Sequence, residues 1–185
     1  MLLVRTACLL ALASGCTLWS DDETPSACTL DQMVDAQIVY ADQDGNVRAV
    51  DDDPHVPLVS APQGGHILLI GARLHAKVTR CTVDVNAALR DPTNSRVIGL
   101  EQRPLTISSY GTDWAGPPAS AGLSDLTNVA VCPNEAAVTA IDGFPFRIEV
   151  RVIGTGGTVI ANPSAMITPT CGDTYCHMDC SPPGM

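Results

Sequence analysis

The sequence has few aromatic residues and little positive charge. Phe, Trp and Tyr make up 4% of the 185 residues, and Lys77 is the only lysine. A core with so few rings must be built mainly from Val, Ile, Leu and Ala, and covalent cross-links would help to stabilise it. Ten Lys and Arg residues against 20 Asp and Glu leave a net charge of -10. We expect no nucleic-acid partner, because phosphate binding needs clustered positive charge.

The acidic residues are concentrated near the N-terminus. Half of them fall between Asp21 and Asp53, where only Arg48 opposes them. This clustering is compatible with cation capture or with a solvated, self-repelling surface, and we favour the surface. The stretch from Asp42 also resembles a calcium loop, with Asp42, Asp44, Asn46 and Asp53 at ligand positions. Val47 stands where such a loop needs glycine, so a hairpin turning at Asp44-Gly45 is the better interpretation.

Local catalytic motifs are missing. The sequence contains no Gly-x-Ser-x-Gly elbow, no His-Glu-x-x-His pair and no glycine-rich phosphate loop. His55, His66 and His75 are scattered, and His66 and His75 border an apolar run with no carboxylate at ligand spacing. We interpret the three as a surface residue and strand-end residues. The sequence therefore predicts a non-enzymatic protein with no cofactor. An enzyme whose site is assembled from distant residues is the least favoured alternative.

The first 16 residues have the features of an export signal. Arg5 precedes an apolar stretch from Ala7 to Ala13, which is too short to span a bilayer. Ala13-Ser14-Gly15-Cys16 resembles the lipobox of bacterial lipoprotein precursors, in which the cysteine is lipidated and signal peptidase II cuts just before it. Ala13 stands where that family usually has Leu, so ordinary cleavage without a lipid is the alternative.

This resemblance implies a particular organisation of the N-terminus. Residues 1–15 would be removed as a signal peptide, and Cys16 would carry the lipid that anchors the protein in the membrane. Residues 16–27 would then form an acidic, flexible tether. Thr17 after the cysteine is compatible with sorting to the outer membrane. The expected location is the cell envelope.

The number of cysteines agrees with a lipidated Cys16. Cleavage removes Cys8, and lipidation of Cys16 leaves six cysteines that can all form disulfides in an oxidising compartment: Cys28, Cys81, Cys132, Cys171, Cys176 and Cys180. Their connectivity does not follow from the sequence. Our expected pairing is Cys81 with Cys132, Cys28 with Cys171, and Cys176 with Cys180.

The C-terminal tail, residues 172–185, is rich in potential metal ligands. Four residues separate Cys171 from Cys176, whereas c-type haem attachment needs two, so haem is excluded. A zinc or copper site at Cys171, Cys176, His177 and Cys180 has suitable residue types. Such a site would leave Cys28, Cys81 and Cys132 unpaired. We therefore favour disulfides and no metal, with the metal site as the alternative.

The remaining pattern is typical of β-strands. Apolar and polar residues alternate in Phe146–Ile153 and in Cys81–Arg90, and His66–Leu74 is a continuous apolar run suited to a buried strand. Further strands are expected in 103–109, 126–131 and 158–168, with a hairpin over 36–50 and one short helix at 133–140. The sequence predicts an all-β fold for residues 28–171, an antiparallel sandwich. From about Gly65 to Cys171 it weakly resembles the immunoglobulin-like domains of bacterial surface proteins.

The segment from Tyr110 to Asp125 is the best candidate binding loop. Tyr110 and Trp114 could stack on a glycan or an envelope protein, or Trp114 could fold back and cap the domain. Together these features predict a lipid-anchored envelope protein with a non-enzymatic binding, adhesion or structural module. The alternative is a metal-binding lipoprotein that uses its tail.

Overall fold

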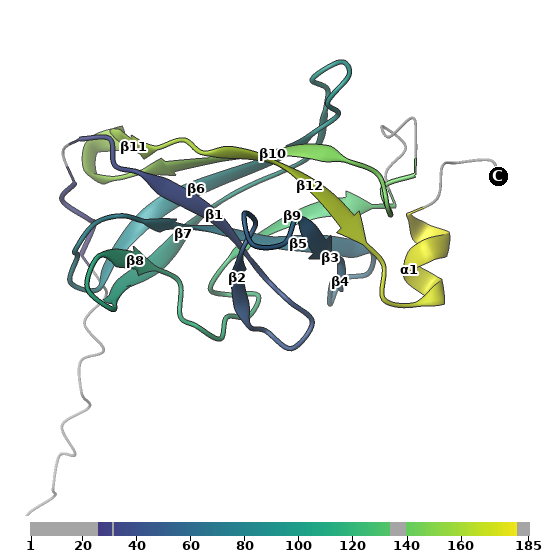
Figure 1. Ribbon diagram of the computed structural model, residues 1–185, viewed down its shortest axis with the longest axis horizontal. Helices are drawn as coiled ribbons and strands as arrows, with labels where there is room; N and C mark the ends of the chain where they lie inside the picture. The colour runs from purple at the N-terminus through teal and green to yellow at the C-terminus, as the bar shows by residue number, and fades with distance from the viewer. Residues whose placement is uncertain (1–25, 31, 134–139, 181–185) are drawn as a thin grey trace, which may run out of the picture.

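The computed structural model describes residues 26–30, 32–133 and 140–180 (Figure 1). The expected signal peptide, Cys16, nearly all of the tether and most of the helix expected at 133–140 lie outside these residues. The described strands are β1 (Ala36–Ala41), β2 (Val47–Ala49), β3 (His55–Pro57), β4 (Val59–Ser60), β5 (His66–Leu74), β6 (Cys81–Arg90), β7 (Val97–Tyr110), β8 (Trp114–Gly116), β9 (Thr127–Cys132), β10 (Phe146–Ile153), β11 (Val159–Ala161) and β12 (Ser164–Thr170). Two short helices accompany them, η1 (Thr155–Gly157) and α1 (Thr174–Asp179).

The fold is all-β, as the sequence predicts. Hydrogen bonds join the strands in the order β2-β1-β5-β8-β7-β6-β10-β12-β3, while β11 pairs with β10, and β4 and β9 pair with β5. The sheet is mixed, and not wholly antiparallel as expected, because β12 and β3 pair in parallel. Pro169 in β12 lies opposite Val56 in this parallel pair.

Alternation along β6 and β10 produces one face of the core. Val83, Val85, Ala87 and Leu89 of β6 are buried, and Ile148 and Val150 of β10 are fully buried between exposed or half-buried neighbours. These two strands pair over seven residue positions, so their apolar side chains fall on the same side of the sheet. The alternation of apolar and polar residues in these two strands therefore corresponds to the alternation of buried and more exposed side chains.

β5 is buried on both faces, which explains its uninterrupted apolar sequence. Leu68 and Ile70 belong to the main core, whereas Ile67 and Leu69 belong to a smaller cluster. Leu126, at the end of the segment that follows β8, completes the smaller cluster and is fully buried. Ala121, inside the expected binding loop, belongs to the same cluster and is buried, so part of that loop packs over β5.

β7 is longer than the sequence pattern indicates. Its first part pairs with β6, and its last three residues, Ser108 to Tyr110, pair with β8. The expected hairpin at 36–50 is present as β1 and β2, with Gly45 at φ 82° in the turn. Within the described residues, no helix has the length and apolar character needed to cross a membrane.

The two ends of the described chain lie at opposite ends of the domain (Figure 1). Ser26 accepts a hydrogen bond from the Thr82 amide, so the chain enters next to the start of β6. The C-terminal helix α1 follows β12 at the other end, close to β3 and β4. The chain entry and helix α1 thus mark the two opposite ends of the domain.

Candidate functional site

Three disulfides connect the six cysteines of the described chain. Cys28 is bonded to Cys81, Cys132 to Cys180, and Cys171 to Cys176. The prediction that these six residues form disulfides is confirmed in this structure, but all three expected pairings are wrong. The pairs are decided by which strand ends meet in space: Ala27 bridges to Thr82, so Cys28 lies beside the first residue of β6.

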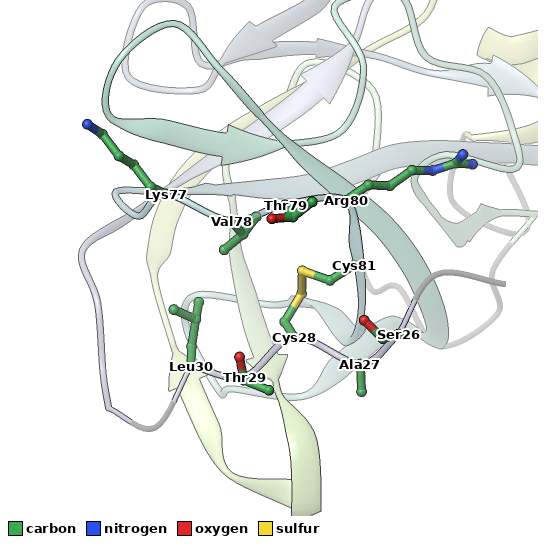
Figure 2. Close-up of a pocket in the computed structure, with 10 residues that line it drawn as sticks. All are labelled: Ser26, Ala27, Cys28, Thr29, Leu30, Lys77, Val78, Thr79, Arg80 and Cys81. Atoms are coloured by element: carbon green, nitrogen blue, oxygen red, sulfur yellow. A yellow bond between two sulfur atoms is a disulfide. The ribbon is translucent and has the colours of Figure 1, made fainter. Parts of the chain in front are cut away.

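At the N-terminal end, the Cys28–Cys81 bond lines a hollow of about 320 Å³ (Figure 2). Residues 26–30 form one wall, and residues 77–81 form the other. Lys77 and Arg80 extend outward from the second wall in opposite directions. Two cations thus border the point where the chain enters an otherwise acidic protein.

The candidate aromatic loop lies next to this hollow. A second hollow lies between the 77–79 segment, Ser109 of β7, and Gly111 and Thr112 in the β7–β8 turn. Tyr110 is 40% exposed. Trp114 is half-buried: its ring centroid lies 5.1 Å from that of His75, and the Arg73 guanidinium carbon lies 5.3 Å from the ring. Trp114 thus packs against residues of β5 and the turn after it, while Tyr110 stays accessible.

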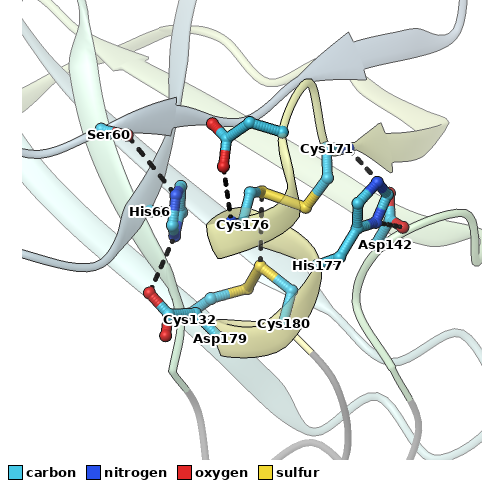
Figure 3. The surroundings of a disulfide bond; sticks show 10 residues. Ser60, His66, Cys132, Asp142, Cys171, Cys176, His177, Asp179 and Cys180 are labelled. Atoms are coloured by element: carbon cyan, nitrogen blue, oxygen red, sulfur yellow. Dashed lines mark hydrogen bonds and ion pairs between the residues drawn. A yellow bond between two sulfur atoms is a disulfide. The ribbon is translucent and has the colours of Figure 1, made fainter.

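At the opposite end, helix α1 places four sulfur atoms close together (Figure 3). Asp173 caps the helix by accepting a hydrogen bond from the Cys176 amide at 2.9 Å. Cys176 and Cys180 are four residues apart and therefore lie on the same side of the helix. Both are buried, at 1% and 2% exposure. One is bonded to Cys171 before the helix, and the other to Cys132 at the end of β9.

His66 is buried beside these sulfurs. It begins β5 directly opposite Cys132 in β9, and 5% of its surface is exposed. Its Nδ1 lies 3.4 Å from a carboxylate oxygen of Asp179, within ion-pair distance, yet this nitrogen makes no hydrogen bond. Its Nε2 lies 3.5 Å from the Ser60 hydroxyl, the outer limit of a hydrogen bond. The imidazole is therefore only weakly partnered in a buried position, which is uncommon for a polar side chain.

His177 occupies a different position from the one proposed in the metal alternative. Its Nδ1 lies 2.7 Å from Oδ2 of Asp142, while Oδ1 of Asp142 accepts the Cys171 amide, also at 2.7 Å. The side chain of His177 is 55% exposed. The Asp142 carboxylate therefore connects the exposed side of α1 to the backbone at Cys171.

The four residues of the metal alternative fall into two groups. Asp142, Cys171 and His177 form one, and His66, Cys176 and Cys180 form the other; within each group the possible ligand atoms lie within 4.8 Å of one another. In both groups the sulfurs are in disulfides, whereas a metal ligand must be a thiolate. Asp142 and His66 are not in the predicted set. The only feature of the sequence that could have indicated a site at His66 is its position at the start of an apolar strand.

The residues of the calcium-like stretch form a hairpin turn. The carboxylate of Asp42 accepts hydrogen bonds from the amides of Asp44 and Asn46, and from the side chains of Asn46 and Arg48. Burial would raise the pKa of Asp42, but the hydrogen bonds from Asn46, Arg48 and Asp44 outweigh it and lower the pKa. Asp53 instead accepts from the amide and ring of His55. The two carboxylates are thus engaged in separate local structures.

No known family matches the chain, and no curated protein was found to be similar to it.

Proposed function

We propose that this protein is exported, lipidated at Cys16 and anchored in the cell envelope, where its β-domain acts as a non-enzymatic binding, adhesion or structural module. The observation that carries the proposal is the pairing of all six cysteines between Cys28 and Cys180. Three disulfides in one small domain are typical of an oxidising compartment. No cysteine of the described chain is left as a partner for Cys16, which supports its use as the lipid-bearing residue.

The orientation of the domain follows from where the chain enters it. The tether would join at Ser26, beside Lys77 and Arg80 and close to the β7–β8 turn. Tyr110 pairs with Trp114 in β8, so it would lie at the end of the domain nearest the anchor, and α1 would lie at the far end (Figure 1). In this arrangement the exposed Tyr110 ring contacts the envelope layer close to the membrane, with the half-buried Trp114 beside it. A glycan strand is a suitable partner, because aromatic rings stack on sugar rings.

Detergent partition and intact mass test the anchor. The mature wild-type protein should enter the detergent phase, carry a lipid mass on Cys16 and show no titratable thiol when denatured without reductant. Cys16→Ala should remain in the aqueous phase with its three disulfides intact. Recovery of unlipidated wild-type protein, or of two or more free thiols, would refute this part of the proposal.

Fluorescence tests the binding loop. In a Trp19→Phe background Trp114 is the only tryptophan. Soluble peptidoglycan fragments should change its emission, and Tyr110→Ala should weaken that binding. Tyr175→Ala, which removes a more exposed tyrosine from α1 at the far end, serves as the control. An unchanged emission spectrum at saturating fragment concentration would argue against glycan binding through this loop.

A second candidate function is metal binding at the α1 end. The buried group of His66, Cys176 and Cys180 favours it, because one imidazole and two sulfurs already lie within ligand distance of one another. Zinc or copper would bind there only after the disulfides are reduced. Metal analysis of protein purified under non-reducing conditions tests this candidate, since one equivalent of metal would contradict the disulfide-bonded state.

A further inference from the structure

Two of the three disulfides touch each other. The sulfur of Cys176, bonded to Cys171, lies 3.9 Å from the sulfur of Cys180, which is bonded to Cys132 (Figure 3). Neither sulfur carries a proton in this state, so the approach is a packing contact and not a hydrogen bond. A thiolate at Cys176 would therefore stand next to the sulfur it needs to attack in a disulfide exchange.

The four sulfurs differ in their access to solvent. Cys171 is half-buried at the edge of the domain, whereas Cys132, Cys176 and Cys180 are buried, with 5% or less of each exposed. A thiol arriving from outside therefore reaches Cys171 first. Attack at that sulfur expels Cys176 as the leaving thiolate, because these two residues form the outer disulfide.

His66 lies where the expelled thiolate would form. A nitrogen of its ring is within 4.8 Å of the sulfurs of both Cys176 and Cys180, and Nδ1 has no hydrogen-bond partner. A buried thiolate needs a neighbouring donor or cation. The imidazole can donate a hydrogen bond toward Cys176 as that sulfur leaves, and so stabilise the thiolate.

We propose that this cluster is a thiol–disulfide relay that transmits exchange from Cys171 at the surface to Cys132 in the core. An external thiolate attacks Cys171, forming a mixed disulfide and breaking the Cys171–Cys176 bond. The Cys176 thiolate then attacks Cys180, forming Cys176–Cys180 and breaking Cys132–Cys180. A second thiol of the same reductant then attacks the mixed disulfide, which releases Cys171 as a thiol and the reductant as its oxidised disulfide. In total, two electrons and two protons from the reductant convert Cys171 and Cys132 to thiols.

The product of the relay is sterically reasonable. Residues four apart rise about 6 Å along a helix, and disulfides join Cα atoms that are about 4.4–6.8 Å apart. The exchange removes the covalent bond between β9 and α1. The relay therefore couples thiol chemistry at the surface to release of the tail, an activity that the proposed binding module does not include.

A pair of single variants tests the attack of Cys176 on Cys180 by itself, without any reductant. Cys171→Ser leaves a thiol on Cys176, next to Cys180, and Cys176→Ser leaves the thiol on Cys171. Each purified protein is quenched in acid, denatured, labelled with N-ethylmaleimide and mapped by mass spectrometry. Cys171→Ser should carry the label mainly on Cys132, with a new Cys176–Cys180 disulfide, and Cys176→Ser should carry it on Cys171. A label that stays on Cys176 would overturn the relay.

Limited reduction of the wild-type protein gives the second measurement, which does not depend on a variant folding. With one equivalent of dithiothreitol, the labelled residues should be Cys171 and Cys132. Labels on Cys171 and Cys176, or on Cys132 and Cys180, would contradict the proposed order.

His66→Gln should slow the appearance of labelled Cys132 by roughly 10²-fold, the low end of what a positioned acid or base contributes. His75→Gln, at the other end of β5, is the control and should leave that rate unchanged; an equal rate in both variants would exclude the role of His66.

Discussion

The disulfide between Cys132 and Cys180 links the last residue of β9 to the residue that caps the C-terminus of helix α1, 48 positions later. It lies at the end of the domain opposite Cys28–Cys81, which closes a sequence separation of 53 residues at the chain's entry point. Cys171–Cys176 closes a separation of only 5 residues. Because these loops differ so much in length, the three bonds should contribute unequally to stability.

Removal of each disulfide measures that difference. In the chain-entropy account, loss of Cys28–Cys81 by a double Cys→Ala change should lower the free energy of unfolding by about 4 kcal/mol, and loss of Cys171–Cys176 by about 2 kcal/mol. Urea unfolding followed by circular dichroism provides both values. A larger loss for the short loop than for the long one would show that this ranking is wrong.

The Asp42 carboxylate should stabilise the β1–β2 hairpin through its hydrogen bonds to backbone amides. Asp42→Ala removes the acceptor for the Asp44 and Asn46 amides and should cost about 1–2 kcal/mol of unfolding free energy. Asp42→Asn keeps an acceptor oxygen, losing mainly the charge facing Arg48, and should cost less than the alanine variant. Equal losses in the two variants would mean that the ion pair with Arg48, and not the turn, is the stabilising contact.

Acid should reduce the contribution of Asp91 to stability. Hydrogen bonds from the hydroxyl and amide of Thr93 lower the pKa of Asp91 below its usual value. A carboxyl whose pKa is lower in the folded state stabilises the fold above the unfolded pKa of about 3.9, and this stabilisation is lost as the pH falls through the folded value. The difference in unfolding free energy between wild type and Asp91→Asn should therefore shrink from pH 6 to pH 2. The use of a difference cancels the general effect of acid on a chain with net charge -10. A difference in unfolding free energy that stayed constant from pH 6 to pH 2 would contradict a lowered pKa of Asp91 in the folded state.

Gly99 should be intolerant of any side chain. A Cβ atom built at this position in β7 would lie 2.3 Å from the carbonyl oxygen of Ala130 and 2.9 Å from the Val129 side chain, so β9 would have to move. Gly99→Ala should therefore cost roughly 1–3 kcal/mol, as overpacking does in other cores. At Gly122 the nearest such atom is 3.9 Å away, and Gly122→Ala should stay within roughly 0.5 kcal/mol of wild type. Thermal and urea unfolding of the two variants provide the comparison.

Sequence alternation predicted the strands whose two faces differ in environment. β6 and β10 follow it, because one face of each packs into the core and the other is at least partly exposed. The continuous apolar run of β5 predicts a buried strand, but the reason for that run, a second buried face covered by Leu126, depends on a residue more than 50 positions later in the chain. β7 was only partly recognised, because Gly99, Pro104 and a run of polar residues interrupt its pattern.

The arrangement of the cysteines could not be predicted in the same way. Parity suggested that six cysteines form three disulfides, but pairing depends on which strand ends meet. Cys132 approaches the tail because β9 lies antiparallel to β5 and ends beside His66. His66 itself enters the cluster from the start of β5, more than 100 residues before α1. Neither approach leaves a local trace in the sequence around Cys171 to Cys180.

The two long-range disulfides also determine how the domain would respond to mechanical force. A pull between Ser26 and Cys180 would pass through the Cys28–Cys81 bond, along residues 81–132, and through the Cys132–Cys180 bond. Residues 29–80 and 133–179 would be shielded from tension. If the protein is anchored through Cys16 as proposed, β6, β7, β8 and β9 alone would carry the load, and extension would stop after those strands had unravelled.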